Sequence, residues 1–232
     1  MRRSCSADEL CTFCAQYVLG TKANSWSLWG ERHGQSSDIL WETETLLLIA
    51  GLGALTEGYV LLLPKAHYLS IGSMPQEELA EFVSVQACVR SLLKCTYGEI
   101  IFFEHGMSSR NRAGGCVEHA HLHGCPSTAD FRPFLRQHLE ERPIHGFGDL
   151  RVLAQEDMPY LFYEDQAGSR FVYPVTEFLP SQFFRKLWAV SVGKAAEWDW
   201  AASMGEENVA RTIERLRAVL SGKTFPNDFV GS

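Results

Sequence analysis

Three histidines alternate with apolar residues in the run His119-Ala120-His121-Leu122-His123. In a β-strand, residues two apart point to the same face, so a strand here would place three imidazoles in one row. Such a row can bind a metal ion, or it can hold a phosphate while one ring acts as nucleophile or general acid and base. The spacing alone leaves both open, and glycines on either side of the run disfavour an ordinary solvated strand.

A second group of candidate ligands is the cysteine pair in Cys11-Thr12-Phe13-Cys14. A Cys-x-x-Cys motif can bind zinc, form a redox pair or occur by chance. The chain has seven cysteines, an odd number at irregular spacing, which indicates a reducing compartment and not a disulfide framework. The pattern gives no role to Cys5, Cys88 or Cys95.

Short apolar runs punctuated by glycine predict strands of an antiparallel sheet. They lie at residues 39–43, 45–50, 58–63 and 100–104. Between the third and fourth runs, Ser73-Met74-Pro75-Gln76 has the spacing of a capping box, and the apolar residues that follow recur with helical period. This pattern predicts a helix over residues 75–97 that ends at Gly98 and covers one face of the sheet.

Beyond residue 126 the pattern mixes helix and strand. Helices are predicted at 131–141, 181–192 and 205–220, and strands at 160–163 and 170–175. Aromatic residues are frequent in this part, which favours packing over disorder. The sequence predicts an α+β fold with a central antiparallel sheet, one long covering helix and an extra C-terminal α+β segment. We divide the chain into a core of residues 1–126 and an extension of residues 127–232, packed on the same domain or at a dimer interface.

The histidine run, continued by Gly124-Cys125-Pro126, resembles the signature of the histidine triad (HIT) superfamily, in which three histidines alternate with apolar residues. Upstream, an apolar run followed by Pro64-Lys65-Ala66-His67 is similar to the family's strand that ends in Pro-Lys-x-His. The Cys-x-x-Cys pair resembles the start of many bacterial members. The resemblance covers residues 8–126 in the correct order, and the extension resembles that of larger bacterial members.

The resemblance implies that the central histidine, His121, attacks the α-phosphate of a nucleotide and forms a covalent nucleotidyl intermediate. His123 would then contact the phosphate or the leaving group. A neutral imidazole attacks phosphorus well, and the resulting phosphoramidate is reactive enough to be cleaved by water or another acceptor. The implied function is a nucleotidyl hydrolase or transferase. The alternative is a nucleotide-binding or interaction protein that kept the HIT fold and lost turnover.

The same resemblance implies a structural zinc site made of Cys11, Cys14, His67 and His119. Members that begin with the cysteine pair complete the site with the histidine of Pro-Lys-x-His and the first histidine of the triad. Tetrahedral zinc takes four nitrogen or sulfur ligands, and such a closed site would leave His121 free. The alternative is that both cysteines are core thiols and His119 is only hydrogen-bonded.

The chain departs from the family on the ligand side. Many members carry an aspartate that binds the ribose hydroxyls, but residues 49–55 here hold no carboxylate. The usual polar turns before the triad are replaced by Glu104-His105-Gly106 and Gly114-Gly115-Cys116. We therefore expect Glu104, His105, Gly115 and Cys116 to contact the substrate, with backbone amides of the second turn holding phosphate oxygens.

Composition limits the partners. The formal net charge of -7 disfavours bulk nucleic acid, but a few local cationic groups can still hold a small nucleotide. The longest apolar runs are far shorter than the roughly 20 residues that span a bilayer, and the N-terminus shows no secretory pattern. We expect a cytoplasmic protein with no membrane partner that binds a small nucleotide, and a homodimer because triad proteins commonly pair.

Overall fold

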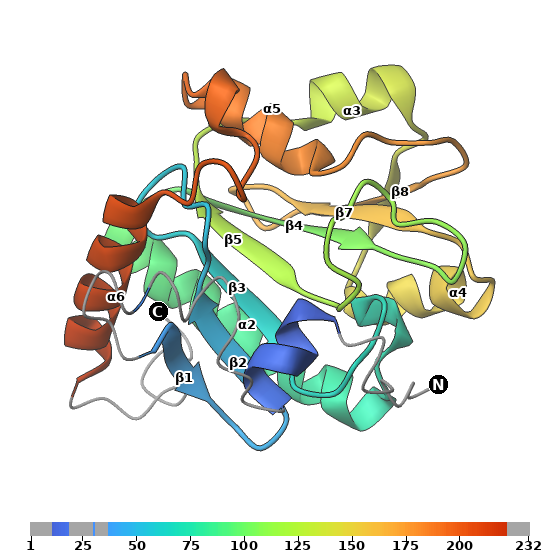
Figure 1. The fold of residues 1–232 in the computed structure, drawn as a ribbon. Helices are drawn as coiled ribbons and strands as arrows, with labels where there is room; N and C mark the ends of the chain where they lie inside the picture. Colours follow the sequence, from blue (N-terminus) through green and yellow to red (C-terminus); the bar gives the residue numbers. More distant parts are fainter. Residues whose placement is uncertain (1–10, 19–29, 31–36, 222–232) are drawn as a thin grey trace.

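The computed structural model describes residues 11–18, 30 and 37–221. Eight strands form one sheet in the order β1-β2-β3-β5-β4-β7-β8-β6, and every neighbouring pair is antiparallel (Figure 1). The strands are β1 Ile39–Glu42, β2 Leu46–Ala50, β3 Val60–Pro64, β4 Ile100–Gly106, β5 Leu122–Pro126, β6 Arg142–Ile144, β7 Tyr160–Glu164 and β8 Arg170–Pro174. The predicted α+β class with a central antiparallel sheet is confirmed.

The sheet is buried on both faces, because alternate residues of its central strands enter two different hydrophobic clusters. In β4, Ile101 and Phe103 enter one cluster, whereas Ile100 and Phe102 enter the other. Strand side chains alternate between faces, so Glu104 lies on the side of Phe102 and the next residue lies on the side of Phe103. This alternation decides which predicted site residues can meet.

The long helix α2 (Gln76–Tyr97) covers the face that holds Phe102, as predicted. Its buried positions include Phe82, Val89 and Leu93, which recur with helical spacing. The predicted capping box is wrong: the N-cap is Pro75 without a side-chain cap, because Ser73 ends the short helix η2 (Ile71–Ser73) and its hydroxyl donates to Ser70 O.

The opposite face is covered mainly by the C-terminal half of the chain (Figure 1). The helices of the C-terminal half are α3 Arg132–His138, α4 Leu150–Gln155, α5 Phe183–Ser191 and α6 Glu206–Leu220, with short helices η3 Phe147–Asp149 and η4 Ala195–Glu197. Phe184 and Trp188 of α5 enter the cluster of Phe103, whereas α4 and η3 pack on the other side. Because β7, β8 and β6 extend the same sheet from β4, the sheet continues across the boundary expected after residue 126.

One local prediction in this half differs from the structure. The helix expected over residues 131–141 is shorter in the structure, where α3 ends at His138, because the chain becomes extended at Leu139 and enters β6 at Arg142.

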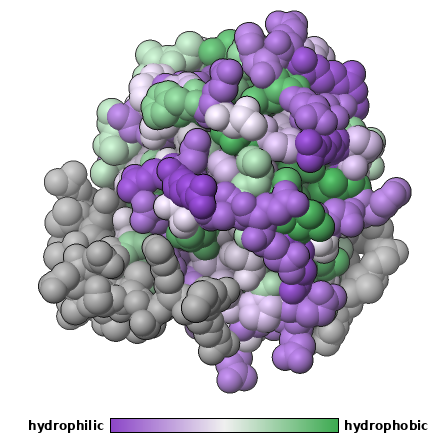
Figure 2. Space-filling view, turned by 90° about the vertical axis from the view of Figure 1, so that its right-hand side faces the viewer, coloured by the Kyte–Doolittle hydropathy of each residue, from purple (hydrophilic) through white to green (hydrophobic). Residues whose placement is uncertain are grey.

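The face on the right of Figure 1, which carries α4, mixes hydrophilic and hydrophobic side chains (Figure 2).

The expected strand through all three histidines is wrong. Strand β5 begins at Leu122, so only His123 belongs to it, and its ladder to β3 pairs His123 with Leu61. Before β5 the chain leaves the sheet, and Ala120 N donates to Tyr68 O. The three imidazoles therefore do not form one row, because the first lies among the cysteines.

Candidate functional site

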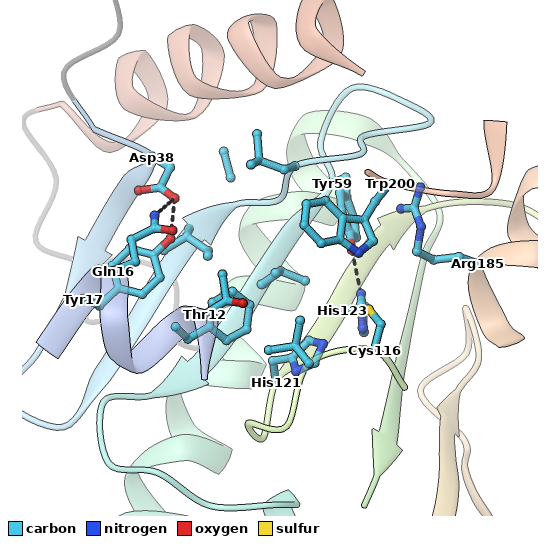
Figure 3. A pocket seen from close by; sticks show the side chains of 16 residues that line it. Thr12, Gln16, Tyr17, Asp38, Tyr59, Cys116, His121, His123, Arg185 and Trp200 are labelled. Carbon is cyan, nitrogen blue, oxygen red and sulfur yellow. Dashed lines mark hydrogen bonds between the residues drawn. The ribbon is translucent and has the colours of Figure 1, made fainter. Parts of the chain in front are cut away.

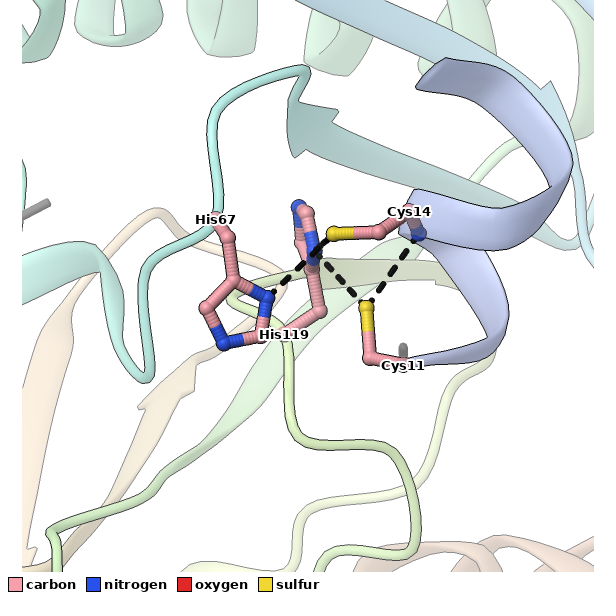
Figure 4. Close-up of side chains that lie close together, drawn as sticks. All are labelled: Cys11, Cys14, His67 and His119. Atoms are coloured by element: carbon pink, nitrogen blue, oxygen red, sulfur yellow. Dashed lines mark hydrogen bonds between the residues drawn. The ribbon is translucent and has the colours of Figure 1, made fainter. Parts of the chain in front are cut away.

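The N-terminal cysteines and two histidines form one compact cluster (Figure 4). One ligand atom from each of Cys11, Cys14, His67 and His119 lies within 4.8 Å of all the others. His119 Nδ1 lies 3.4 Å from Cys11 Sγ and 3.6 Å from Cys14 Sγ, and His67 Nδ1 lies 3.4 Å from Cys14 Sγ. The cluster joins the π-helical turn η1 (Cys14–Val18) to the chain after β3 and the chain before β5.

These separations fit a tetrahedral metal ion. Zinc bonds of about 2.0 Å to nitrogen and about 2.3 Å to sulfur give ligand–ligand edges of about 3.3–3.8 Å. His119 Nε2 donates to Pro64 O at 2.7 Å, which leaves the Nδ1 lone pair facing both cysteine sulfurs. Burial lowers the pKa of His119 to about 4, so its imidazole is neutral. The four residues could hold a metal ion.

His121 follows directly and is held by the backbone of the cluster. Its Nδ1 lies 2.5 Å from His119 O, and because a carbonyl only accepts, Nδ1 carries the proton. The other ring nitrogen, Nε2, is then a bare lone pair, and it makes no hydrogen bond within residues 11–18, 30 and 37–221. The ring of Phe13, which lies between the two cysteines in sequence, meets His121 edge-on at 5.4 Å. Burial lowers the pKa of His121, which favours a neutral ring.

His123 lies beside His121, with ring centroids 4.7 Å apart. Its ring stacks on Phe103 at 4.4 Å, and its Nδ1 lies 2.7 Å from the hydroxyl of Tyr59. If the hydroxyl donates to Nδ1, the proton of His123 is on Nε2. That nitrogen is buried and has no partner within the described part of the chain.

Both histidines line a pocket between η1, the sheet and α5 (Figure 3). Its other walls are mostly apolar, and they include Ile49, Leu52 and Leu61. A concave, largely apolar pocket with a few polar groups is the usual form of a small-molecule site.

One end of the pocket carries a buried carboxyl that the sequence analysis missed. Asp38 accepts hydrogen bonds from Gln16 Nε2 at 3.0 Å and from the hydroxyl of Tyr17 (Figure 3). Burial raises the pKa of Asp38 to about 6 against the opposing hydrogen bonds. The family's aspartate was expected within residues 49–55, which hold no carboxylate. Asp38 is instead the residue immediately before β1, and it lines the pocket.

The opposite end carries Arg185 of α5, beside Trp200, Tyr59 and Cys116 (Figure 3). Neither Arg185 nor Trp200 was expected from the sequence, because both lie in the extension far from the triad. The composition of α5 alone gives no such signal, since an arginine on a helix is most often on a solvated face.

Of the four residues expected to contact the substrate, one lines the pocket and three do not. Cys116 lines the pocket, and burial raises the pKa of its thiol. His105 lies behind His123, its centroid 6.0 Å away, and its Nε2 accepts from Phe184 N at 3.3 Å. Burial lowers the pKa of His105 to about 3. His105 thus packs behind His123 and does not line the pocket.

Glu104 and Gly115 are not placed at the pocket. Glu104 lies on the α2 side of the sheet, where its carboxyl accepts from Ile71 N at 2.7 Å and from the Tyr160 hydroxyl at 2.9 Å. The amide of Gly115 donates to Arg112 O at 2.7 Å, so it is already used. The guanidinium of Arg112 pairs with Glu118 near the surface.

Comparison with known proteins gives distant similarities. No family model matches the chain. It is similar to CWF19-like protein 1 of Xenopus laevis (25% identical over 171 residues, 67% of this chain and 30% of that protein) and of Homo sapiens (24% over 180 residues, 70% and 32%). The chain thus spans about a third of the length of these curated relatives.

Solved structures with similarity include a histidine triad nucleotide-binding protein from Sulfolobus tokodaii (16% identical, 93% of this chain and 99% of that chain, TM-score 0.38). A HIT family protein from Bacillus anthracis is 23% identical over 44% of this chain and 73% of its own, with a TM-score of 0.36.

Among the described residues, no helix is both long and apolar enough to cross a bilayer.

Proposed function

We propose that this chain is a nucleotidyl hydrolase or transferase of the HIT superfamily that works through a covalent intermediate on His121. The observation that carries the proposal is the state of His121 in the pocket. Its Nδ1 proton is held by His119 O, so Nε2 is the lone pair available to a ligand. A buried, neutral imidazole fixed in one tautomer is preorganised as a nucleophile.

In the first step, His121 Nε2 attacks the α-phosphorus of the nucleotide and forms a P–N bond. The bond from phosphorus to the leaving group breaks, and the leaving group departs with the electron pair and takes its proton from solvent. The Nε2–H of His123 would hydrogen-bond to the departing oxygen without transferring its proton. In the second step, water or another acceptor attacks phosphorus, the P–N bond breaks, and its electron pair returns to His121 Nε2. The acceptor's proton passes to solvent, so the protein is unchanged after one turnover.

We propose that the metal in the cysteine cluster is zinc and that its role is structural. All four ligands would come from the protein, which is typical of closed structural sites. Bound there, zinc would fix His119, and His119 in turn fixes the ring of His121 through its carbonyl. The ion supplies no step of the reaction.

A nucleotide-binding protein without turnover is the second candidate. Two expected substrate contacts, Glu104 and the amide of Gly115, are used elsewhere in the fold, and this observation favours the second candidate. The enzyme would form a covalent nucleotidyl adduct, whereas the binding protein would not.

The test is intact-mass measurement after incubation with nucleoside 5'-phosphoramidates and dinucleoside polyphosphates. The enzyme proposal expects a nucleotidyl adduct on wild type, located on His121 by peptide mapping, and none on His121→Asn. His145→Asn is the matched control, because His145 is exposed on a distant turn. Binding of these nucleotides with no adduct and no product would favour the second candidate.

A further inference from the structure

Arg185 is a buried cation whose head is only partly satisfied by the protein. Its side chain is 3% exposed and its Nε donates to Trp198 O at 3.0 Å and to Gln182 Oε1 at 3.2 Å. Both terminal nitrogens, Nη1 and Nη2, are shielded from solvent and have no hydrogen-bond partner within the described residues. A guanidinium has five N–H donors, so most of this group's donors are unused.

The charge has no direct ion-pair partner either. Among the described residues no carboxylate forms a salt bridge with Arg185, and Asp199 acts on it only at longer range, with Gln182 hydrogen-bonded to both. The neighbours of the guanidinium are the rings of Tyr59 and Trp188, each 5.9 Å from its carbon. Burying a charge without a partner is costly, so a counter-charge from outside the chain fits this position.

The protein holds the guanidinium in place at some cost. Gln182, which precedes α5, has a φ of 58°, a left-handed conformation uncommon for a residue with a side chain. Its Oε1 accepts from Arg185 Nε and from Trp200 N, and its Nε2 donates to Asp199. Gly53 lies against the other side, where an added Cβ would be 3.0 Å from Arg185 Nη2. The head of Arg185 is therefore fixed and not a freely moving surface group.

The position of Arg185 in the pocket indicates what it binds. Arg185 lines the same pocket as His121 and His123, and Figure 3 shows it entering from the side opposite Asp38. A guanidinium binds phosphate through paired, charge-assisted hydrogen bonds. We infer that Arg185 is the anion-binding group of this pocket and that it holds phosphate oxygens of the nucleotide next to His121 and His123. The inference deepens the proposed function and rests on it for the nucleotide part of the ligand.

The arrangement also accounts for the missing phosphate-side residues. In the turn of Gly114 and Gly115, the amide of Gly115 donates to Arg112 O, and Gly114 O accepts from Gln182 N at 2.6 Å. The turn thus anchors the start of α5, and α5 supplies the cation. In this chain the C-terminal extension completes the site that the triad begins.

The test compares Arg185→Gln, Arg185→Lys and Arg211→Gln with wild type. Arg211 is the matched control, because it is a half-exposed arginine on α6 that pairs with Glu207. The probes are inorganic pyrophosphate, a nucleoside 5'-monophosphate and the corresponding nucleoside, measured by calorimetry at fixed ionic strength. We expect Arg185→Gln to weaken pyrophosphate and monophosphate binding by about tenfold or more, with nucleoside binding unchanged. Arg185→Lys should retain part of the affinity, and Arg211→Gln all of it.

Thermal unfolding without ligand separates binding from folding. Because Arg185→Gln removes a buried charge that has no direct ion-pair partner, the melting temperature of the variant should stay close to that of wild type, whereas pyrophosphate should stabilise the variant less. Equal pyrophosphate affinity in wild type and Arg185→Gln, or no pyrophosphate binding by wild type, would overturn the inference. A nucleotidyl adduct on His121 with unaltered phosphate affinity in Arg185→Gln would reject the role of Arg185 alone. Phosphate binding through Arg185 without any adduct would reject only the proposed catalysis.

Discussion

The carbonyl of His119 accepts the Nδ1 proton of His121 at 2.5 Å, while the ring of His119 points away to the two cysteines. One residue therefore joins the candidate metal cluster to the candidate nucleophile. Its ring belongs to the cluster and its backbone fixes the tautomer of the next histidine. Substitutions in the two histidines should consequently have different effects.

His121→Asn should lower turnover by about 10³-fold or more, because asparagine cannot form a reactive phosphoramidate. The fold should survive, since the amide can still donate to His119 O. Steady-state kinetics on a nucleotide that wild type turns over gives the loss, and circular dichroism checks the fold. Near-normal turnover by His121→Asn would exclude the covalent mechanism.

Zinc should be present in stoichiometric amount and should depend on the cysteine cluster. Cys11→Ser and His119→Asn should lose the ion and melt several degrees lower, because metal binding to a preformed site adds to folding free energy. Elemental analysis and thermal unfolding measure both effects. Cys95→Ser is the control, since Cys95 is an exposed residue of α2. Wild type free of zinc and a Cys11→Ser variant with unchanged melting would together contradict this prediction.

A homodimer is expected in solution. Four large apolar side chains are exposed on the C-terminal half, namely Phe134 (41%), Val152 (57%), Phe178 (87%) and Val190 (66%), and a dimer interface would cover some of them. Light scattering coupled to size-exclusion chromatography at micromolar concentration should give twice the chain mass. A monomer mass across the accessible concentration range would rule the dimer out.

Local periodicity was enough to predict much of the fold. The helical repeat from Leu79 to Leu93 predicted α2, and the runs around Leu48 and Phe162 predicted strands, because these patterns report the burial of one or both faces. The four residues that the family resemblance implied as ligands also lie together in the cysteine cluster. Short elements such as α4 and β6 were missed, since they span too few residues to establish a period.

The polar side of the pocket depends on contacts between distant segments, so it was less predictable. Asp38 and Arg185 are 147 positions apart (185 minus 38), and no local pattern relates them. The departure of His119 from the strand follows from its contacts with the N-terminal cysteines. By contrast, strand alternation alone separates Glu104 from the face of Phe103 and His123, and that signal was available in the sequence.

Glu104 should make stability depend on pH in a direction unusual for a carboxyl group. Burial raises its pKa from 4.5 to about 8, against the hydrogen bonds from Ile71 N and Tyr160. The native state thus keeps the proton to higher pH than the unfolded chain does. The stabilisation from this group is full below about pH 4.5 and is lost as the pH rises through about 8, with a slope of at most about 1.4 kcal/mol per pH unit.

Glu104→Gln should remove that slope, because glutamine is neutral at every pH and keeps an oxygen for Ile71 N and an amide for the Tyr160 hydroxyl. The variant should match wild type below about pH 4.5, exceed it progressively up to about pH 8, and keep a constant advantage at higher pH. Urea unfolding across this range measures the difference. Glu99→Gln is the control, because Glu99 is exposed and lies between α2 and β4. Parallel pH profiles for wild type and Glu104→Gln would mean that Glu104 is ionised in the folded protein, with the two hydrogen bonds outweighing its burial.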